Sequence, residues 1–318
     1  MAPVLVVLHA GDLPDGLESV AEVADVRYAT ADTLADAVDG ADVLLLWDFF
    51  SPAVESAWPS CGSLKWIHIA AAGVDSLMFD ELVESDVVVT NSRGVFDRPI
   101  AEFVLAQILA FAKDSERSRA LQHSKIWQHR ETERIDGAHA MIVGTGAIGR
   151  AIAALLSAVG MSISGVGRTA REDDRDFGTV YASDDLAAEV ACADYLVLVA
   201  PLTDQTRGMV DDSVLAAMKP GSRIVNVGRG ELLDTEALLT HLGSGHIAGA
   251  ALDVFETEPL SADHPLWTAE NVIITPHMSG DALGWKQRLA DVFADNACRY
   301  FRGEPLLNVV DKKLGFVV

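Results

Sequence analysis

The fold of this chain is restricted above all by the segment AMIVGTGAIGRAIAALLSAVG, residues 140–160, in which an apolar run meets three spaced glycines and an Ala-rich helical pattern. A strand that turns sharply into a helix uses such glycines. Gly144 permits the tight turn, Gly146 lets a ligand approach the backbone, and Gly149 lets the helix pack on the strand. The helix N-terminus offers N–H groups to phosphates. The segment predicts a dinucleotide-binding turn, although a ligand-free turn or one that binds S-adenosylmethionine remains open.

The rest of the chain repeats this alternation of short apolar runs and helical patterns. Before the glycines, helical patterns at Leu34–Val38 and Ser76–Val83 lie between the strand-like runs VLVVLH (4–9), VLLLW (43–47), WIHIA (66–70) and VVVTN (87–91). From the glycine segment onward the strand-like runs are AMIVG, SISGVG, YLVLVA, RIVNVG, AGAALDVF and VIITP. Strands that alternate with helices predict parallel sheets covered on both faces.

The length of 318 residues, half of them hydrophobic, suits two domains. We expect a long helix over 99–114, with Asp97 as its N-cap and Pro99 in its first turn, and an amphipathic helix over 281–302. The predicted fold class is α/β, with two Rossmann-like parallel-sheet domains. Residues 1–97 and 281–318 form a substrate domain, and the dinucleotide-binding domain, 98–280, is inserted in it.

Composition excludes several function classes. The net charge of −23 repels phosphate backbones and argues against nucleic-acid binding. We see no apolar run long enough for a membrane span and no signal peptide at the start. Cys61, Cys192 and Cys298 form no CxxC pair, so we expect isolated thiols in a reducing cytoplasm and no metal site. The acidic composition fits either a salt-adapted surface or a codon bias.

The strand after the glycine turn bears on the cofactor. NAD-binding folds place an acidic residue at its end, on the ribose 2′-hydroxyl. This chain has Gly167, Arg168 and Thr169 there, and Arg171 follows closely. An arginine and a hydroxyl suit a 2′-phosphate. We therefore predict a preference for NADP(H), with NAD(H) possible; the alternative is a merely exposed arginine.

Four polar residues at later strand ends suggest acid–base chemistry: Arg229, Asp253, Glu258 and His277. Reducing a carbonyl by hydride requires a proton donor on the forming alkoxide, and histidine suits that role. Glu258 is the candidate that would fix the imidazole tautomer. Arg229, between two glycines, supplies a planar cation for a substrate carboxylate. Each residue alone is also compatible with a structural role in a loop.

With these residues in place, the sequence resembles the D-isomer-specific 2-hydroxyacid dehydrogenases along nearly its whole length. The matching motifs are AAGVDSL (71–77), TNSRGVFDRPIAEFVL (90–105), VGTGAIG (143–149), APLTDQTRGMV (200–210), NVGRGELLD (226–234), ALDVFETEPL (251–260) and TPHMSG (275–280).

The resemblance implies roles for individual residues. Arg229 would bind substrate, Glu258 would orient the histidine, and His277 would be the acid/base. The backbone of Ala72, Gly73 and Val74 would hold the substrate carboxylate. Residues implied to contact the cofactor are Gly144, Thr145, Gly146, Ala147, Ile148, Gly149, Arg168, Thr169, Pro201, Thr206, Val227 and Asp253, the last of them on the nicotinamide carboxamide. The family also implies a homodimer built on the cofactor domains, with the Trp127 region as an arm.

Some positions depart from the family pattern. The acid after the second strand is absent, as in NADP-using glyoxylate/hydroxypyruvate reductases, and charged Arg93, Asp97 and Arg98 replace small or apolar residues. We expect surface positions for these charges, and core packing for Trp47, Phe49, Phe50 and Trp285, although pocket positions are the alternative in both cases. We expect no regulatory domain after the last predicted helix.

The leading hypothesis is an NADP(H)-preferring reductase of glyoxylate, hydroxypyruvate or a related small 2-keto acid. Two alternatives remain: a formate- or phosphite-type dehydrogenase on the same fold, and a non-catalytic NAD(P)-sensing binding protein.

Overall fold

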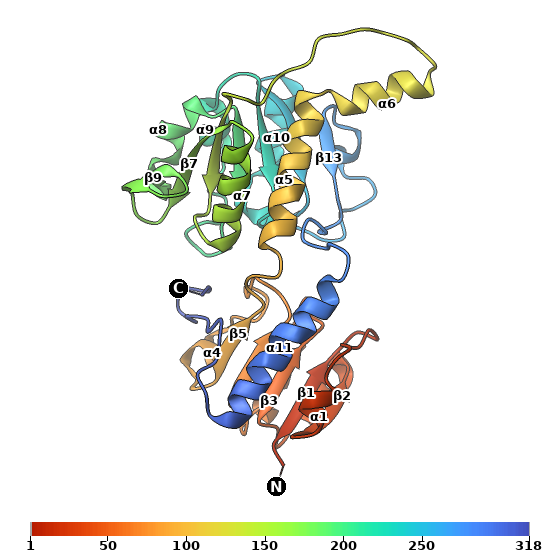
Figure 1. The fold of residues 1–318 in the computed structure, drawn as a ribbon, viewed down its shortest axis with the longest axis vertical. Helices are drawn as coiled ribbons and strands as arrows, with labels where there is room; N and C mark the ends of the chain where they lie inside the picture. Colours follow the sequence, from red (N-terminus) through yellow and green to blue (C-terminus); the bar gives the residue numbers. More distant parts are fainter. Residues whose placement is uncertain (1, 318) are drawn as a thin grey trace. The chain divides into compact units, whose positions relative to one another are not determined.

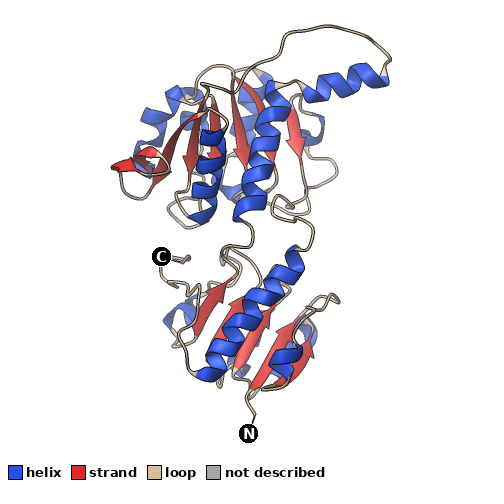
Figure 2. Ribbon diagram, in the orientation of Figure 1, coloured by secondary structure: helices blue, strands red, loops and turns tan. Residues whose placement is uncertain are grey.

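A computed structural model describes residues 2–317, which form two compact units (Figure 1). Unit 1 contains the described residues up to Phe96 and from Ala282 onward, and unit 2 is the continuous segment Asp97–Asp281. Each unit is a parallel or mostly parallel sheet covered by helices (Figure 2). The predicted fold class, two Rossmann-like α/β domains, is therefore confirmed.

Unit 1 is built on a five-stranded sheet in the order β2-β1-β3-β4-β5, and all its strand pairs are parallel. The strands are β1 (Val4–Leu8), β2 (Asp25–Ala29), β3 (Val43–Leu46), β4 (Trp66–Ile69) and β5 (Val88–Asn91). The helices are α1 (Glu18–Ala21), α2 (Leu34–Val38), α3 (Ala53–Ala57), α4 (Asp80–Glu84) and α11 (Trp285–Arg302). Helix α11 covers one face of the sheet, where Phe293 stacks on Trp66 with ring centroids 5.5 Å apart.

Unit 2 is built on an eight-stranded sheet in the order β13-β12-β11-β10-β6-β7-β9-β8. Its strands are β6 (His139–Val143), β7 (Ser162–Gly167), β8 (Arg171–Asp174), β9 (Gly178–Ala182), β10 (Tyr195–Leu198), β11 (Ser222–Asn226), β12 (Ile247–Leu252) and β13 (Val272–Ile274). Only the edge pair β8–β9 is antiparallel among the strand pairs of residues 2–317. The central strands are continuous apolar runs because helices bury both of their faces.

The helices of unit 2 lie in two layers. They are α5 (Asp97–Ala112), α6 (Ser115–His123), α7 (Ala147–Ala158), α8 (Leu186–Glu189), α9 (Asp212–Ala217) and α10 (Thr235–Gly243). Helices α5 and α7 pack against each other, and α9 packs against both α8 and α10. Helix α6 and the irregular stretch after it extend away from the sheet (Figure 1).

The ends of three predicted helices were wrong. The pattern at Ser76–Val83 is helical only from Asp80, since residues 75–77 form a turn. Asp97 is the first residue of α5 rather than the residue before it. The last helix begins at Trp285 rather than at residue 281, because Gly284 adopts a left-handed φ of 81°. No helix within residues 2–317 is long and apolar enough to cross a membrane.

Candidate active site

The predicted functional side chains of unit 2 follow strands of its sheet at their carboxyl ends. The strand order reverses between β6 and β10, because the chain proceeds from β6 to β7 on one side and later to β10 on the other. In open α/β sheets, ligands bind outside the carboxyl ends of the strands at such a reversal. Gly144 follows β6, Arg229 follows β11, and His277 follows β13.

The glycine turn has the geometry that a dinucleotide requires. A Cβ added at Gly144 would lie 2.7 Å from the backbone nitrogen of Ala200, and one at Gly149 would lie 1.9 Å from the carbonyl oxygen of Gly144. At Gly146, by contrast, an added Cβ meets nothing within 4 Å. Helix α7 also has no side-chain cap on its first N–H groups. The residues present therefore fit a pyrophosphate above Gly146.

Arg168 and Thr169 are exposed residues of the turn after β7. Arg171, the second arginine near this turn, donates from Nε to the Asp174 carboxylate at 2.8 Å. Thr145 links the two turns, because a Cβ at Gly167 would lie 3.1 Å from its Oγ1. No acidic side chain stands between β7 and Arg171, as the sequence indicated.

The predicted cofactor residues after β10 and β11 lie in ordered turns. Thr206 donates from its hydroxyl to the carbonyl oxygen of Pro201 at 2.7 Å, which closes the turn after β10. Val227 is buried, and its N–H donates to Leu198 at 3.0 Å. These turns border the glycine turn, since β10 pairs with both β6 and β11.

Arg229 occupies a backbone conformation that Asn226 fixes. The Asn226 amide donates to the Arg229 carbonyl oxygen at 2.9 Å, and its Oδ1 accepts from the Gly228 N–H at 3.1 Å. Sequence reasoning missed Asn226, although an Asn two residues before a Gly-Arg-Gly run is a signal for such a turn. Gly230 is required for packing, because an added Cβ would lie 1.9 Å from the carbonyl carbon of Phe255.

His277 and Glu258 form the pair that the sequence suggested. Nδ1 of His277 lies 2.8 Å from Oε2 of Glu258, and the other carboxylate oxygen accepts from the Phe255 N–H at 2.9 Å. Burial raises the pKa of Glu258, but the hydrogen bonds from His277 and Phe255 and the charges of His277 and Arg229 outweigh it and leave the pKa below its ordinary value. The carboxylate therefore stays ionised at neutral pH, where it stabilises an imidazolium.

Asp253 holds the turn that carries His277. It is fully buried, and its Oδ1 accepts from the Thr275 hydroxyl at 2.5 Å and the Met278 N–H at 3.0 Å. Oδ2 accepts from the Ser279 N–H at 2.8 Å, and the backbone carbonyl accepts from His277 at 2.8 Å. This positioning of the histidine was not anticipated; the predicted contact of Asp253 with the nicotinamide stays a prediction.

The predicted substrate loop, Ala72–Gly73–Val74, follows β4 in unit 1. Val74 is buried, whereas Ala72 and Gly73 are partly exposed. The amide of Asn91 donates to the Ala72 carbonyl oxygen at 2.6 Å, so β5 holds the loop in place. Asn91 is a second residue that sequence reasoning missed.

The charged and aromatic residues singled out beside these motifs have varied surroundings. Arg98 pairs with Glu102 at 2.6 Å on the exposed side of α5, and Arg93 donates to the Val317 carbonyl oxygen at 3.2 Å. Trp285 contacts Phe49 and Phe96 within unit 1. Core packing was the wrong expectation for Phe50, whose side chain is exposed at the surface beside the Phe49 ring.

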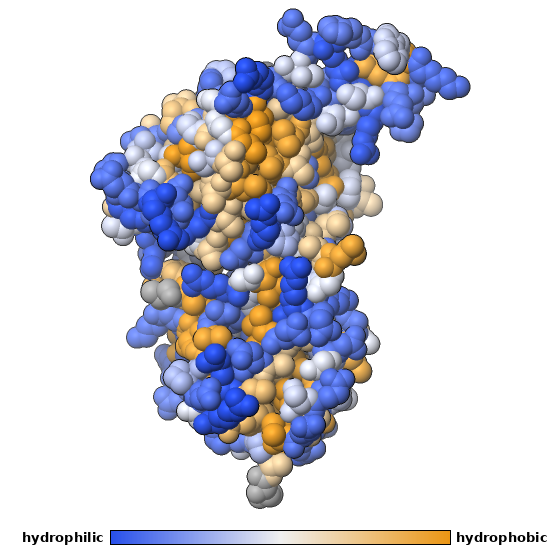
Figure 3. Space-filling model, viewed as in Figure 1, coloured by the Kyte–Doolittle hydropathy of each residue, from blue (hydrophilic) through white to orange (hydrophobic). Residues whose placement is uncertain are grey.

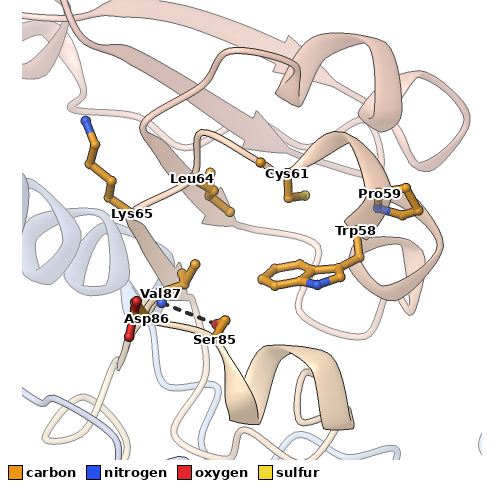
Figure 4. Close-up of a pocket in the computed structure, with 9 residues that line it drawn as sticks. Trp58, Pro59, Cys61, Leu64, Lys65, Ser85, Asp86 and Val87 are labelled. Atoms are coloured by element: carbon orange, nitrogen blue, oxygen red, sulfur yellow. Dashed lines mark hydrogen bonds between the residues drawn. The ribbon is translucent and has the colours of Figure 1, made fainter.

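A separate cavity of about 380 Å³ lies in unit 1 at the amino ends of β4 and β5, the edge opposite to the 72–74 loop (Figure 4). Two of its polar side chains have partners: Lys65 pairs with Asp42 at 2.7 Å, and the Ser85 hydroxyl accepts from the Val87 N–H at 3.2 Å. Burial raises the pKa of the Cys61 thiol to about 11, so this thiol is not a thiolate nucleophile at neutral pH. The cavity is not part of the candidate active site.

Comparisons with known proteins identify the family of this chain. The family model for the D-isomer specific 2-hydroxyacid dehydrogenase NAD binding domain matches residues 105–279. A glyoxylate reductase of Aeropyrum pernix is 33% identical over 95% of this chain and 94% of its own.

Two solved structures are also similar. A D-isomer specific 2-hydroxyacid dehydrogenase of Xanthobacter autotrophicus, in complex with NADPH and MES, has 31% identity and a TM-score of 0.84 over 99% of this chain and 100% of its own. An NADPH-dependent glyoxylate/hydroxypyruvate reductase of Sinorhizobium meliloti, in complex with NADP and sulfate, has 26% identity and a TM-score of 0.82 over 98% of this chain and 100% of its own.

A match over more than half of the chain, a relative of similar length and a shared two-unit fold lead to one conclusion. The chain belongs to the D-isomer specific 2-hydroxyacid dehydrogenase family and is an NAD(P)-dependent 2-hydroxyacid dehydrogenase.

Proposed function

We propose that this enzyme is an NADP(H)-preferring reductase of a small 2-keto acid such as glyoxylate or hydroxypyruvate, with the D-2-hydroxy acid as its product. The observation that carries the proposal is the contact of His277 Nδ1 with Glu258 Oε2 at 2.8 Å. This pair lies at the carboxyl ends of the strands, the same edge of the sheet as Arg229 and the glycine turn. A sensor that only bound the nucleotide would need no proton donor of this kind. The glyoxylate reductase relative supports the substrate class.

The residues divide the reaction between them. When bound, the cofactor supplies the hydride that reduces the carbonyl carbon. His277 donates a proton to the carbonyl oxygen as that oxygen becomes an alkoxide, and Glu258 holds Nδ1 and stabilises the imidazolium beforehand. Arg229 binds the carboxylate and keto oxygen of the substrate, and the backbone of Ala72, Gly73 and Val74 holds the carboxylate. The reverse reaction returns the proton to His277.

The preference for NADP(H) is supported by the turn after β7. Arg168 and Thr169 provide a cation and a hydroxyl where NAD-specific folds have an acid. Two of the similar structures hold NADPH or NADP. In a chain of net charge −23, an arginine at this point also offsets repulsion of the extra phosphate.

We further propose a homodimer through unit 2, in the cytoplasm. The outward side of α5 and α7 carries small and apolar residues, and Figure 3 shows hydrophobic surface gathered over these helices. Beyond α6, the side chain of Trp127 is fully exposed, at 102%. A tryptophan and an apolar helix face are typical of surfaces that a second copy covers. Sedimentation of the purified protein at micromolar concentration tests this; a monomer contradicts it.

The test of the reaction is an absorbance assay at 340 nm with NADPH or NADH against a panel of small 2-keto acids. We expect oxidation of NADPH with glyoxylate or hydroxypyruvate. His277→Ala should lower kcat by roughly a hundredfold or more, because the proton donor is lost, while NADPH still binds.

His246→Ala is the matched control, since the ring of this histidine contacts the Leu215 carbonyl oxygen at 3.1 Å and the His241 ring, and the residue lies before β12 rather than after it. We expect it to keep turnover. Wild-type-like rates for His277→Ala, or no oxidation of either cofactor by the wild type with any acid, would reject the proposed reaction.

A further inference from the structure

A cluster of charged side chains ties the hairpin after β7 to helix α7. Arg150, directly after Gly149, donates from its two Nη atoms to Asp174 at 2.9 and 3.0 Å, and from Nη1 to Asp176 at 2.5 Å. Arg171 of β8 donates to the same Asp174 carboxylate at 2.8 Å. We call these four residues the Asp174 cluster. Its members come from α7, from β8 and from the turn between β8 and β9.

The Asp174 cluster is partly shielded from water. The Asp174 side chain is only 6% exposed, and its Oδ1 also accepts the backbone N–H of Asp176 at 3.1 Å. The Arg150 guanidinium lies 5.4 Å from the centre of the buried Phe177 ring. Charge-assisted hydrogen bonds at such a site fix geometry more firmly than exposed ion pairs do. The hydrogen bonds from Arg150 hold the pKa of Asp174 far below its usual range, so the cluster is ionised at neutral pH.

The cluster joins the two segments on which cofactor recognition depends. Helix α7 begins at the glycine turn, and the Arg168–Thr169 turn connects β7 with β8. One end of that turn is fixed by β7, where a Cβ at Gly165 would lie 3.0 Å from Phe177 and from Thr145 of the glycine turn. The other end continues directly into Arg171, which Asp174 holds. Strand β8 lies at the edge of the sheet, where β9 is its one neighbouring strand. The cluster therefore adds a second attachment of β8 to unit 2, through helix α7.

We propose that the Asp174 cluster positions the Arg168–Thr169 turn to receive the 2′-phosphate of NADP(H), which makes Arg150 and Asp174 positioning residues for the choice between the two nicotinamide cofactors. The inference rests on the proposed function, because Arg168 is assumed to meet the 2′-phosphate. NAD(H) shares the pyrophosphate but lacks the 2′-phosphate. Loosening the turn therefore weakens NADPH binding selectively. If the cluster had only a structural role, its loss would weaken the binding of NADPH and NADH equally.

The experiment measures dissociation constants of NADPH and NADH by fluorescence titration of the full-length protein. For Arg150→Met we expect the NADPH constant to rise roughly tenfold and the NADH constant to change by less than about twofold. Arg134→Met is the matched control, because it removes an exposed pair with Asp136 (2.5 Å) in the same unit. The control should leave both constants unchanged.

A double-mutant cycle with Arg168→Met identifies the route of the effect. Arg168→Met alone should remove the NADPH preference, and adding Arg150→Met to it should cause no further selective loss. Additive selective losses would overturn the proposal, and so would parallel losses for both cofactors or no change in Arg150→Met. If Arg150→Met does not fold, Asp176→Asn removes one bond of the cluster and should give a smaller loss in the same direction; an unchanged ratio of constants there would also overturn the proposal.

The wild-type titration separates this inference from the proposed function. A wild type that binds NADH as tightly as NADPH, or binds neither, contradicts the proposed cofactor preference and removes the inference with it. A wild type that prefers NADPH, with no selective effect of the variants, contradicts the role of the cluster alone.

Discussion

Two carboxylates, buried Asp253 and partly exposed Glu258, hold His277, the proposed proton donor. His277 adopts a left-handed φ of 50°, which costs a non-glycine residue about 1 kcal/mol or more. The backbone carbonyl of Asp253 accepts its N–H, and the Asp253 carboxylate accepts the next two N–H groups. Glu258 then fixes the ring. The geometry for proton transfer therefore exists before substrate binds.

Removing the carboxylate from this pair should slow reduction. Glu258 is ionised at neutral pH because its pKa is lowered, and its Oε2 holds Nδ1 of His277, the proposed proton donor. In Glu258→Gln, kcat at neutral pH should fall about tenfold or more, because the histidine ring loses its charged partner. Steady-state assays with glyoxylate check this; an unchanged kcat would show that Glu258 has no such role.

The residue types at the site could be predicted, but their supports could not. Arg229, Glu258 and His277 follow strands and match family motifs, so their approximate location follows from the strand pattern. The bonds from Asp253 to Thr275, Met278 and Ser279 depend on the left-handed turn at His277, which no periodicity indicates. The Arg150–Asp174 contact could not be predicted either, because it joins α7 to β8 and forms only when the β8–β9 hairpin has folded.

At the scale of elements, strand prediction was accurate where the strands are buried. The apolar runs at 43–47 and 195–200 contain β3 and β10, which are fully covered by helices. Strands β2, β8 and β9, with sequences DVRYA, REDD and GTVYA, were missed because most of their residues are exposed or half-buried and none of them has a continuous apolar run. Strands without such a run are therefore the least predictable elements in this chain.

The tie between α7 and the β8–β9 hairpin should be visible in stability as well as in binding. Breaking it in Arg150→Met should lower the free energy of unfolding by about 2 kcal/mol at pH 7. Because the pKa of Asp174 is lowered in the folded state, this contribution is fully present above the unfolded Asp pKa of about 3.9 and is lost as pH falls below it.

Urea unfolding of wild type and Arg150→Met at several pH values measures this difference. The two free energies should converge as the pH falls below about 4. A difference that persists unchanged in acid would mean that packing on Phe177, rather than the ion pair, is what the substitution removes. Arg134→Met again serves as the comparison, with a change near zero expected for its exposed pair.

At the scale of the whole molecule, the dominant property is a net charge of −23. The 47 Asp and Glu residues outnumber the 24 Lys and Arg residues, so even complete ion pairing leaves a large excess of carboxylates that repel one another in the folded state. Such repulsion is screened by salt, with a Debye length of about 10 Å at 0.1 M and about 3 Å at 1 M.

We therefore expect Tm to rise by several degrees between about 0.05 M and about 1 M NaCl. Differential scanning fluorimetry measures this, and the same titration with choline chloride distinguishes screening from specific sodium binding. A Tm that falls with salt would indicate that attractive ion pairs, not the excess of like charge, dominate the electrostatics of the fold.

The insertion of unit 2 within unit 1 has a consequence for synthesis on the ribosome. All five strands of the unit 1 sheet are made before Asp97. Helix α11, whose Phe293 stacks on Trp66 of the sheet, is made only after Asp281. At about 5–20 residues per second, the nascent sheet waits on the order of ten seconds or more for its covering helix. Unit 2, a continuous segment, is complete before that helix emerges. A nascent-chain chaperone would therefore bind the apolar sheet face of unit 1, which is made first but completed last.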